Sequence, residues 1–376
     1  MRVYFDNAAT TPMSKEVVDA MLPYMYLQFG NPSAIHFYGR ETRSAIEKAR
    51  KTVAGLLNCS PSEIFFTSGG TESSNTAIRC GLETTGIKHA ITSPIEHHCV
   101  LHTFQELEKE GKVELHYVKV DSRGRFDLQH LRSLLQEIGE RTFVSLMHAN
   151  NEIGTMMDID AVAAICKEFN AVFHSDTVQS MAHYRYDLQK TPVHLIQGSA
   201  HKFHGPKGVG FLYVNHAIKI HPLIYGGAQE RNMRAGTENV YGIVGLAKAM
   251  ELAYERLEET KAQTEDVRHY MMEQLKENFS GVTFHGDYEG SYLYTILNVA
   301  FPLNDKTELL LFNLDIAGVC ASSGSNQSSH VLEAIHADAN EVSIRFSFSE
   351  YNTREEVDFT IARLRELLPA TAGMKV

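Results

Sequence analysis

The sequence lacks the marks of three large classes of protein. None of its apolar runs approaches the roughly 18–20 consecutive residues that a membrane-spanning helix needs. The N-terminus lacks the long apolar stretch of a secretory signal, so we expect a cytoplasmic protein that does not contact membranes. Acidic residues outnumber basic ones, giving a net charge of −11. This charge argues against a nucleic-acid binder, which needs a basic face for phosphates.

Cysteine is scarce and carries no pairing pattern. The five cysteines are scattered, and no CxxC motif joins any two of them: Cys59, Cys80, Cys99, Cys166 and Cys320. This arrangement indicates neither a disulfide framework nor a zinc knuckle. Histidine is frequent, with 19 residues, but HExxH and other ligand spacings are absent, so we predict no metal site.

What is present is typical of a globular protein with a large core. Hydrophobic residues make up 43% of the 376 residues, an ordinary share for such a protein. At roughly 100–200 residues per domain, this length suits two domains. Composition gives no function, so the motifs must supply it.

From about residue 63 to residue 214, short apolar runs alternate with helical patterns. The runs are of strand length and rich in β-branched or aromatic residues: 64–67, 90–92, 113–118, 143–147, 171–174, 193–196 and 209–214. Apolar residues at helical spacing predict one helix after Asp127, with its face at 128–138, and another over 159–166. This alternation predicts a mostly parallel sheet covered by helices.

After residue 239 the pattern changes to that of a smaller α+β domain. Residues 240–277 predict one long helix or two joined helices. They are followed by a strand, a helix, a loop, a strand and a last helix: 294–299, 307–316, 322–329, 342–347 and 353–367. We expect a large domain over residues 13–250 and a small domain made from residues 1–12 and 251–376.

A glycine-containing motif, Thr67-Ser-Gly-Gly-Thr-Glu-Ser73, follows a predicted strand and opens a predicted helix. The glycines allow the backbone to curl closely, and hydroxyls lie beside the free N–H groups of a helix N-terminus. This is an anion site suited to a phosphate. The motif is neither a Walker A loop nor GxGxxG. The alternative is an ordinary helix N-cap.

Three further motifs end or follow predicted strands. Asp176 stands where open α/β sheets place ligands; it suits a cationic ring nitrogen, a metal or a helix cap. Lys202 is a candidate Schiff-base lysine, because a desolvated amine becomes nucleophilic. Its competitor, Lys207, lies in a Gly-Pro-Lys-Gly turn, and an ordinary surface lysine is the alternative for both. His97 has the shape to lie flat on a planar cofactor or to be a packed or solvated ring.

Together these motifs place a phosphate cradle, an acid, a lysine and an imidazole at the strand ends of one sheet. That combination suits pyridoxal phosphate, which needs a phosphate site, a carboxylate at its ring nitrogen and an amine at its aldehyde.

The chain also resembles the cysteine desulfurases, a branch of the class V aminotransferase family of fold-type I pyridoxal-phosphate enzymes. The segments that carry the resemblance run in order along almost the whole chain: 4–12, 30–33, 66–73, 96–97, 147–154, 174–179, 199–202, 233–239 and 343–347. The resemblance implies an α/β fold with a mostly parallel central sheet between helices, plus the smaller α+β domain.

The resemblance implies a role for each matching residue. In the family pattern, Lys202 forms the Schiff base and moves the Cα proton, and Asp176 pairs with the pyridinium nitrogen. His97 stacks on the ring and is a second catalytic residue that moves protons. The other implied cofactor-binding residues are Gly70, Thr71, Ser199 and His201 at the phosphate, Gln179 at the ring hydroxyl, and Asn151. Arg345 would bind the substrate carboxylate, with Asn31 near the substrate. Thr237 would reach a phosphate in a partner subunit, which implies a homodimer.

The implied reaction converts L-cysteine to L-alanine and passes sulfur to an acceptor thiol, with a sulfur-acceptor or scaffold protein of iron–sulfur cluster assembly as partner. One departure matters. Desulfurases carry a cysteine after a Ser-Ser-Gly-Ser-Ala run, whereas residues 320–332 here read CASSGSNQSSHVL and no cysteine follows.

Three accounts of the missing cysteine stay open. The chain is a desulfurase with a shortened loop, a related lyase or aminotransferase that needs no thiol, or an impaired homologue kept for partner binding. Cys320 precedes the run and is a candidate substitute nucleophile, while Cys99 lies beside His97, close to the implied site.

Overall fold

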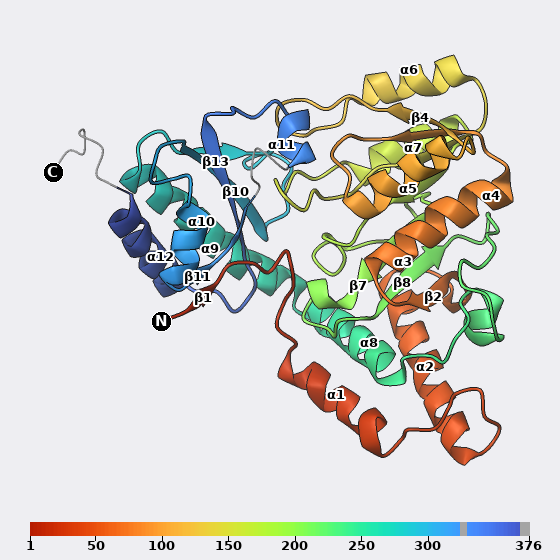
Figure 1. Ribbon diagram of the computed structural model, residues 1–376. Coiled ribbons are helices and arrows are strands. Elements are labelled where there is room, and N and C mark those ends of the chain that lie inside the picture. Colours follow the sequence, from red (N-terminus) through yellow and green to blue (C-terminus); the bar gives the residue numbers. More distant parts are fainter. Residues whose placement is uncertain (324–328, 369–376) are drawn as a thin grey trace.

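The computed structural model describes residues 1–323 and 329–368, in which the two larger of three sheets lie side by side with their helices (Figure 1). The larger sheet has seven strands in the order β2-β8-β7-β6-β5-β3-β4. Their bounds are β2 (Ile64–Thr67), β3 (His89–Thr92), β4 (Glu114–Tyr117), β5 (Thr142–Ser145), β6 (Val172–Ser175), β7 (Leu195–Ser199) and β8 (Gly210–Val214). Strand β8 runs antiparallel to both of its neighbours, β2 and β7, and the other pairs in this sheet are parallel. The predicted, mostly parallel sheet is therefore confirmed, and each predicted run overlaps one strand.

Helices cover both faces of this sheet. One face packs against α1 (Lys15–Tyr26), α2 (Phe37–Leu56), α6 (Leu128–Ile138), α7 (Ile159–Glu168) and α8 (Val240–Glu255). The other face packs against α5 (His98–Lys109) and a helical stretch made of α3 (Gly70–Asn75), a π turn (Thr76–Cys80) and α4 (Gly81–Thr85). Central strands β5 to β8 are buried along their whole length, as expected for strands covered on both faces.

The ends of α6 show how local sequence sets an element. The Asp127 side chain accepts a hydrogen bond from the backbone N–H of His130, which caps the first turn. Leu131 and Leu135 face the core, and Gly139 ends the helix in a left-handed conformation with φ 64°. The predicted helix after Asp127 is confirmed.

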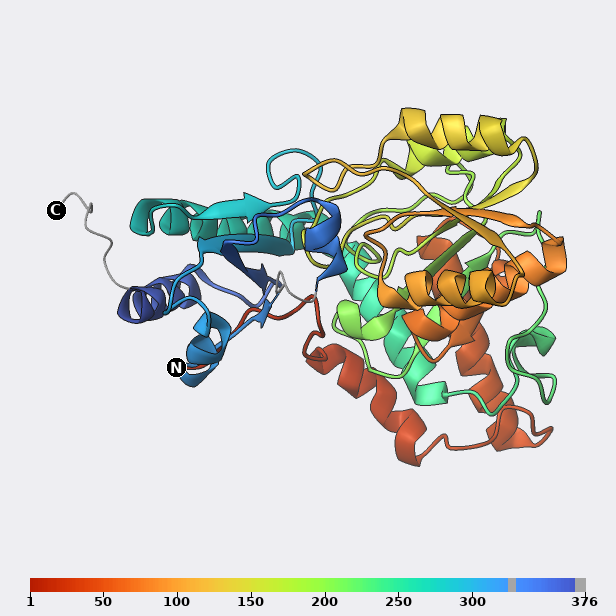
Figure 2. The same ribbon diagram turned by 45° about the horizontal axis from the view of Figure 1, so that its top comes forward.

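The smaller sheet has four antiparallel strands in the order β12-β13-β10-β9. The strands are β9 (Thr283–His285), β10 (Ile296–Pro302), β12 (Ser322–Ser323) and β13 (Glu341–Ser347). Its apolar face packs against α9 (Leu257–Asn278), α10 (Leu310–Ile316) and α12 (Arg354–Leu367), which lie together in Figure 2. The opposite face carries Asn298 and Arg345, whose side chains donate to the carbonyl groups of Glu152 and Asn151 beside the larger sheet.

The elements after residue 239 follow the sequence predictions in part. Residues 240–277 form two helices that meet at Arg256, which is one of the two predicted arrangements. The predicted loop over 322–329 begins with β12, and its residues 324–328 lie outside the described residues; the short helix α11 (His330–Ala334) follows. Strand β9 was not predicted, because its three residues have no distinctive alternation.

The N-terminal segment packs with the smaller sheet and forms a separate two-stranded sheet beside it. Strand β1 (Val3–Tyr4) pairs in parallel with β11 (Val319–Cys320), and Val3 and Phe5 are buried in the same apolar cluster as α9 and α12. Three short 3-10 turns complete the elements: Pro61–Glu63, Ala200–Lys202 and Gln229–Asn232. The division into domains at residues 12 and 250 stays a prediction. Within the described residues, no helix has both the length and the apolar character needed to cross a membrane.

Candidate active site

A cavity of about 220 Å³ opens where the parallel strands of the larger sheet end at their carboxyl termini. Open α/β sheets bind their ligands at this edge. Most residues singled out from the sequence line it together. The lining consists of Gly70, Thr71, His97, Cys99, Met147, Ala149, Asn151, Asp176, Val178, Gln179, Ser199, His201 and Lys202.

The glycine motif forms one wall of this cavity. Gly69 has φ +148°, a conformation that side chains other than glycine rarely adopt. Gly70 begins α3, and no side chain caps this helix N-terminus. A Cβ atom built on Gly69 would lie 3.5 Å from the Ser199 hydroxyl oxygen, so that hydroxyl lies beside the same turn. Uncapped N–H groups and a nearby hydroxyl are what an anion such as a phosphate requires.

Asp176 follows β6 and is 5% exposed. One carboxylate oxygen accepts a hydrogen bond from the backbone N–H of Val178 at 2.9 Å, which fixes the side chain. Behind it, His174 contacts the Ser145 hydroxyl at 2.7 Å and the Gln197 side-chain oxygen at 2.8 Å. Burial lowers the pKa of His174, so this ring is neutral. Asp176 thus places a buried carboxyl group at the cavity wall.

Lys202 ends a 3-10 turn that follows β7, and its amine is held by the N-terminal segment. The Nζ atom donates hydrogen bonds to the Ala8 carbonyl at 2.6 Å and the Ala9 carbonyl at 3.1 Å. Burial, aided by the positive charge of Arg345, lowers the pKa of Lys202 to about 8. Lys207, the competitor, is exposed. The amine of Lys202 is therefore partly unprotonated near neutral pH, as a Schiff-base lysine requires.

His97 caps the start of α5: its Nδ1 accepts a hydrogen bond from the backbone N–H of Cys99 at 3.2 Å. Burial lowers the pKa of His97. Below it, Glu96 is fully buried and accepts hydrogen bonds from the Met147 N–H at 2.9 Å and the Ser93 hydroxyl at 2.7 Å. Burial raises the pKa of Glu96 to about 8. This acid was not predicted, because nothing in the sequence shows that it is buried.

Two more side chains reach the N-terminal segment from the cavity. Gln179 donates a hydrogen bond to the Ala8 carbonyl at 3.0 Å, so it shares an acceptor with Lys202. His201 lies 3.2 Å from the Thr10 hydroxyl, and burial lowers its pKa to about 4. The sequence analysis assigned no role to residues 8–10, although they lie in the matching segment 4–12.

With this geometry established, comparison with known proteins decides the family. The sequence profile described as Aminotransferase class-V matches residues 3–359. A cysteine desulfurase IscS of Dictyoglomus turgidum is 44% identical, over 97% of this chain and 94% of that protein. The chain belongs to the cysteine desulfurase branch of the class V aminotransferases. A putative cysteine desulfurase IscS 1 of Bacillus subtilis is 41% identical, over 95% of this chain and 96% of that protein.

Solved structures agree with this assignment. A NifS-like protein superposes with a TM-score of 0.91 at 41% identity, covering 97% of this chain and 99% of that one. The apo cysteine desulfurase of Thermococcus onnurineus gives a TM-score of 0.87 at 25% identity, covering 97% and 94%. The predicted fold-type I architecture is confirmed.

As a member of the class V aminotransferases, this chain uses pyridoxal phosphate as its cofactor. The residues present fit it. An uncapped helix N-terminus suits the phosphate, the buried carboxylate of Asp176 suits a protonated ring nitrogen, and the amine of Lys202 suits the aldehyde.

Arg345 approaches the cavity from the smaller sheet without lining it. Its Nη1 donates to the Asn151 carbonyl at 2.7 Å, and its Nη2 pairs with Asp6 at 2.9 Å. The buried Nε has no hydrogen-bond partner within the described residues. The guanidinium therefore has donor capacity left for an anion.

Two predicted residues lie apart from the cavity. Asn31 is exposed in the segment between α1 and α2, where its side chain accepts a hydrogen bond from the Ser33 N–H at 2.9 Å. Thr237 is exposed shortly before α8. Neither contributes to the cavity of its own chain.

No cysteine of the described chain is an evident sulfur acceptor. Cys320 lies on β11 and does not line the cavity. Cys99 does line it, 3.0 Å from Nδ1 of His97, but burial raises the pKa of its thiol to about 12. Cys59, Cys80 and Cys166 are removed from the cavity, and burial raises the pKa of each. Residues 324–328, which include the position where the family carries its nucleophile, lie outside the described residues.

Proposed function

We propose that this chain is a pyridoxal-phosphate-dependent cysteine desulfurase that converts L-cysteine to L-alanine and passes sulfur to an acceptor thiol. The observation that carries the proposal is the meeting of Lys202, Asp176 and His97 in one cavity, with the pKa of the lysine lowered to about 8. The relatives named cysteine desulfurases support the choice of substrate.

When bound, pyridoxal phosphate supplies an aldehyde carbon and a ring that stores an electron pair. Gly70, Thr71 and Ser199 offer N–H and hydroxyl donors to its phosphate. The Asp176 carboxylate keeps a proton on the ring nitrogen, because a buried anion favours an adjacent cation. His97, which lines the cavity, would pack on the ring of the cofactor.

Lys202 is the group that removes and returns the Cα proton. With a pKa of about 8, the amine is populated in both its protonated and unprotonated forms near neutral pH. General acid–base catalysis requires both forms. The carbonyl groups of Ala8 and Ala9 position Nζ whenever the amine is free.

Arg345 binds the substrate carboxylate. Arginine holds a carboxylate with two parallel hydrogen bonds, and its Nε lacks a partner. Nη2 of Arg345 pairs with Asp6 at 2.9 Å, so the incoming substrate carboxylate competes with Asp6 for this atom. We place Asn31 near the substrate on the family pattern alone.

The absent loop cysteine favours a second candidate, β-elimination from cysteine. That reaction needs the same early proton removal and no thiol on the protein, and it yields pyruvate, ammonia and sulfide. The Cys99 thiol, with its raised pKa, is a poor nucleophile at neutral pH. A related aminotransferase and an impaired homologue kept for partner binding are further alternatives.

One experiment separates these functions. The purified chain with pyridoxal phosphate is incubated with L-cysteine and a dithiol acceptor, and alanine, pyruvate and sulfide are quantified. Alanine supports the desulfurase, and pyruvate supports elimination. If neither alanine nor pyruvate forms, the result supports a binding role. Lys202→Ala is the negative control and should abolish both products together with the Schiff-base absorption. Cys320→Ala and Cys99→Ala test the substitute nucleophiles: unchanged alanine formation excludes each.

We also propose a homodimer that acts in the cytoplasm, with a sulfur-acceptor or scaffold protein of iron–sulfur cluster assembly as partner. Support for the dimer comes from exposed apolar side chains on and after α1: Leu22, Met25, Tyr26, Leu27, Phe29, Ile35, Phe37 and Tyr38. A contiguous set of this kind marks a protein interface. Exposed Thr237 is then free to reach the partner's cofactor phosphate. Light scattering of the parent chain and of Phe29→Asp tests this proposal: the parent should have the mass of a dimer and the variant that of a monomer.

A further inference from the structure

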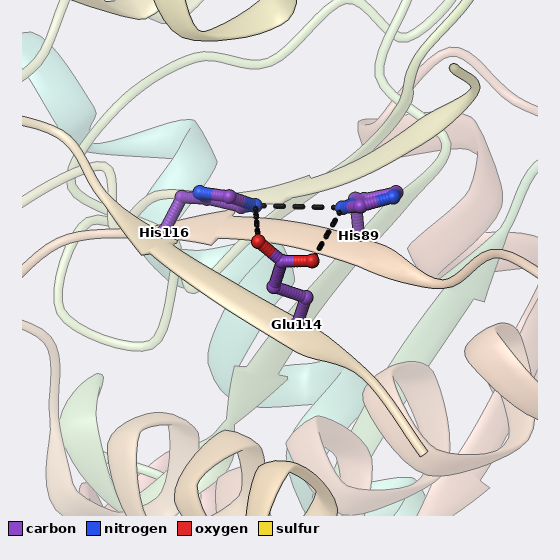
Figure 3. Close-up of side chains that lie close together, drawn as sticks. All are labelled: His89, Glu114 and His116. Carbon is purple, nitrogen blue, oxygen red and sulfur yellow. Dashed lines mark hydrogen bonds and ion pairs between the residues drawn. The ribbon is translucent and has the colours of Figure 1, made fainter. Parts of the chain in front are cut away.

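His89, Glu114 and His116 converge at the edge of the larger sheet, and the function above uses none of them (Figure 3). His89 begins β3, and Glu114 and His116 lie on the edge strand β4. The register pairs His89 with Glu114, and residues two apart on a strand share a face, so all three side chains lie on one face. The two imidazoles are 21% and 22% exposed, within reach of solvent yet held by neighbours.

Only one contact among the three groups is a hydrogen bond, and it is a long one between the two imidazoles. Nδ1 of His89 lies 3.5 Å from Nε2 of His116, and each of these atoms lies 3.6 Å from a carboxylate oxygen of Glu114. Good N–H···O hydrogen bonds measure about 2.7–3.2 Å. The imidazole–imidazole hydrogen bond is therefore long, and both contacts to Glu114 are at ion-pair rather than hydrogen-bond separations.

The same separations fit a shared zinc ion. With zinc–nitrogen and zinc–oxygen bonds of about 2.0–2.1 Å, tetrahedral ligand atoms lie about 3.3 Å apart. One ligand atom from each of His89, Glu114 and His116 lies within 4.8 Å of the other two, so modest side-chain movements would bring the three groups to this spacing. Two imidazoles and one carboxylate are a ligand set that zinc uses, with water in the fourth position.

A second carboxylate backs one of the ligands. Nε2 of His89, the nitrogen pointing away from the cluster, lies 3.9 Å from a carboxylate oxygen of Glu140. A histidine that binds metal through one nitrogen commonly presents the other to a carboxylate, which fixes the ring and its tautomer. Glu140 follows Gly139, the residue that ends α6, so it comes from an independent element.

We propose that His89, Glu114 and His116 bind one zinc ion, with Glu140 supporting His89. The site clamps the edge strand β4 to β3 at the amino-terminal ends of these strands. The cavity lies at their carboxyl ends, so the ion stabilises the sheet without entering the chemistry. This inference is independent of the proposed reaction.

Zinc titration of the chain loaded with pyridoxal phosphate tests the proposal. After removal of metal with a chelator, calorimetry should show one zinc ion bound per chain. His89→Gln and His116→Gln should weaken binding at least 100-fold. Glu140→Gln should weaken it about 10-fold, the lower end of the effect of a supporting carboxylate. Zinc should raise the Tm of the parent chain and leave that of His116→Gln unchanged.

Two matched control variants test whether zinc binds at other histidines of the chain. His221 pairs with Glu83 at 2.9 Å but has no second imidazole in its pair, so His221→Gln should keep full affinity. His102 stacks on His98 with ring centroids 4.8 Å apart, so His102→Gln tests the other histidine cluster. The proposal is overturned if the parent chain binds no zinc, or if His102→Gln loses zinc while His89→Gln and His116→Gln keep it. Glu114→Gln separates loss of zinc binding from misfolding, because Glu114 is 66% exposed and its replacement should not disturb the fold. This variant must lose zinc binding while keeping the Tm of the metal-free parent chain.

Discussion

The amine of Lys202 should react with pyridoxal phosphate far faster near neutral pH than an ordinary lysine does. Burial and the charge of Arg345 lower its pKa from 10.5 to about 8. At pH 7, roughly a tenth of such an amine is unprotonated, against roughly 0.03% for a pKa of 10.5. The reactive fraction therefore rises about 300-fold.

The assay is recombination of the cofactor-free chain with pyridoxal phosphate, followed by the growth of Schiff-base absorption from pH 6 to pH 11. Free α-acetyl-lysine measured in parallel corrects for ionisation of the aldehyde compound itself. The rate should rise with pH and level off above a midpoint near pH 8. Arg345→Met removes a charge that lowers the pKa of Lys202, so the midpoint should move to higher pH.

Arg354→Met is the matched control. Arg354 pairs with Asp266 on the surface, away from Lys202, and this variant should keep the parent midpoint. A parent midpoint near pH 10 would refute the reasoning, since it would mean that the amine is as well solvated as a free lysine. An unchanged midpoint in Arg345→Met would refute the part assigned to the guanidinium.

Three further variants probe the scaffold of the site. Glu96→Gln should make stability less dependent on pH: the raised pKa of Glu96 contributes stability fully below pH 4.5, and this is lost as pH rises through about 8. Denaturation at pH 5 and pH 9 should show a smaller difference for the variant than for the parent; an equal difference would contradict this. Glu230→Gln should destabilise by about 3–5 kcal/mol in urea unfolding, because it leaves the buried guanidinium of Arg50 without its 2.7 Å ion-pair partner. A loss below 1 kcal/mol would count against this. Gly69→Ala should cost about 1–3 kcal/mol through its φ of +148° and weaken pyridoxal phosphate binding in equilibrium titration; parent-like affinity would show that the turn tolerates a side chain.

The larger sheet was predictable because its strands are buried on both faces and therefore read as continuous apolar runs. The α6 helix was predictable because Asp127 and the spacing of Leu131 and Leu135 are local signals. Strand β9 was not, since three partly exposed residues hold their place only through pairing with β10.

The cavity was predicted better than its surroundings. Asp176, Lys202 and His97 stand at strand ends, and parallel strands bring their carboxyl ends to one edge. By contrast, Glu96 looks like any surface acid until burial is known. The carbonyl group of Ala8 carries no signal at all, because backbone acceptors occur at every residue.

The first ten residues run from the strand pair β1–β11 to the wall of the cavity. Val3 and Tyr4 add a strand to β11, and a few residues later the carbonyl groups of Ala8 and Ala9 hold the lysine amine. A polyhistidine tag fused directly to Met1 would disturb this segment, and with it the carbonyl groups that hold the amine of Lys202. Carboxyl-terminal tagging is therefore the safer choice for kinetic work, and loss of the leading decapeptide should impair the enzyme although no acid–base side chain is removed from the pocket.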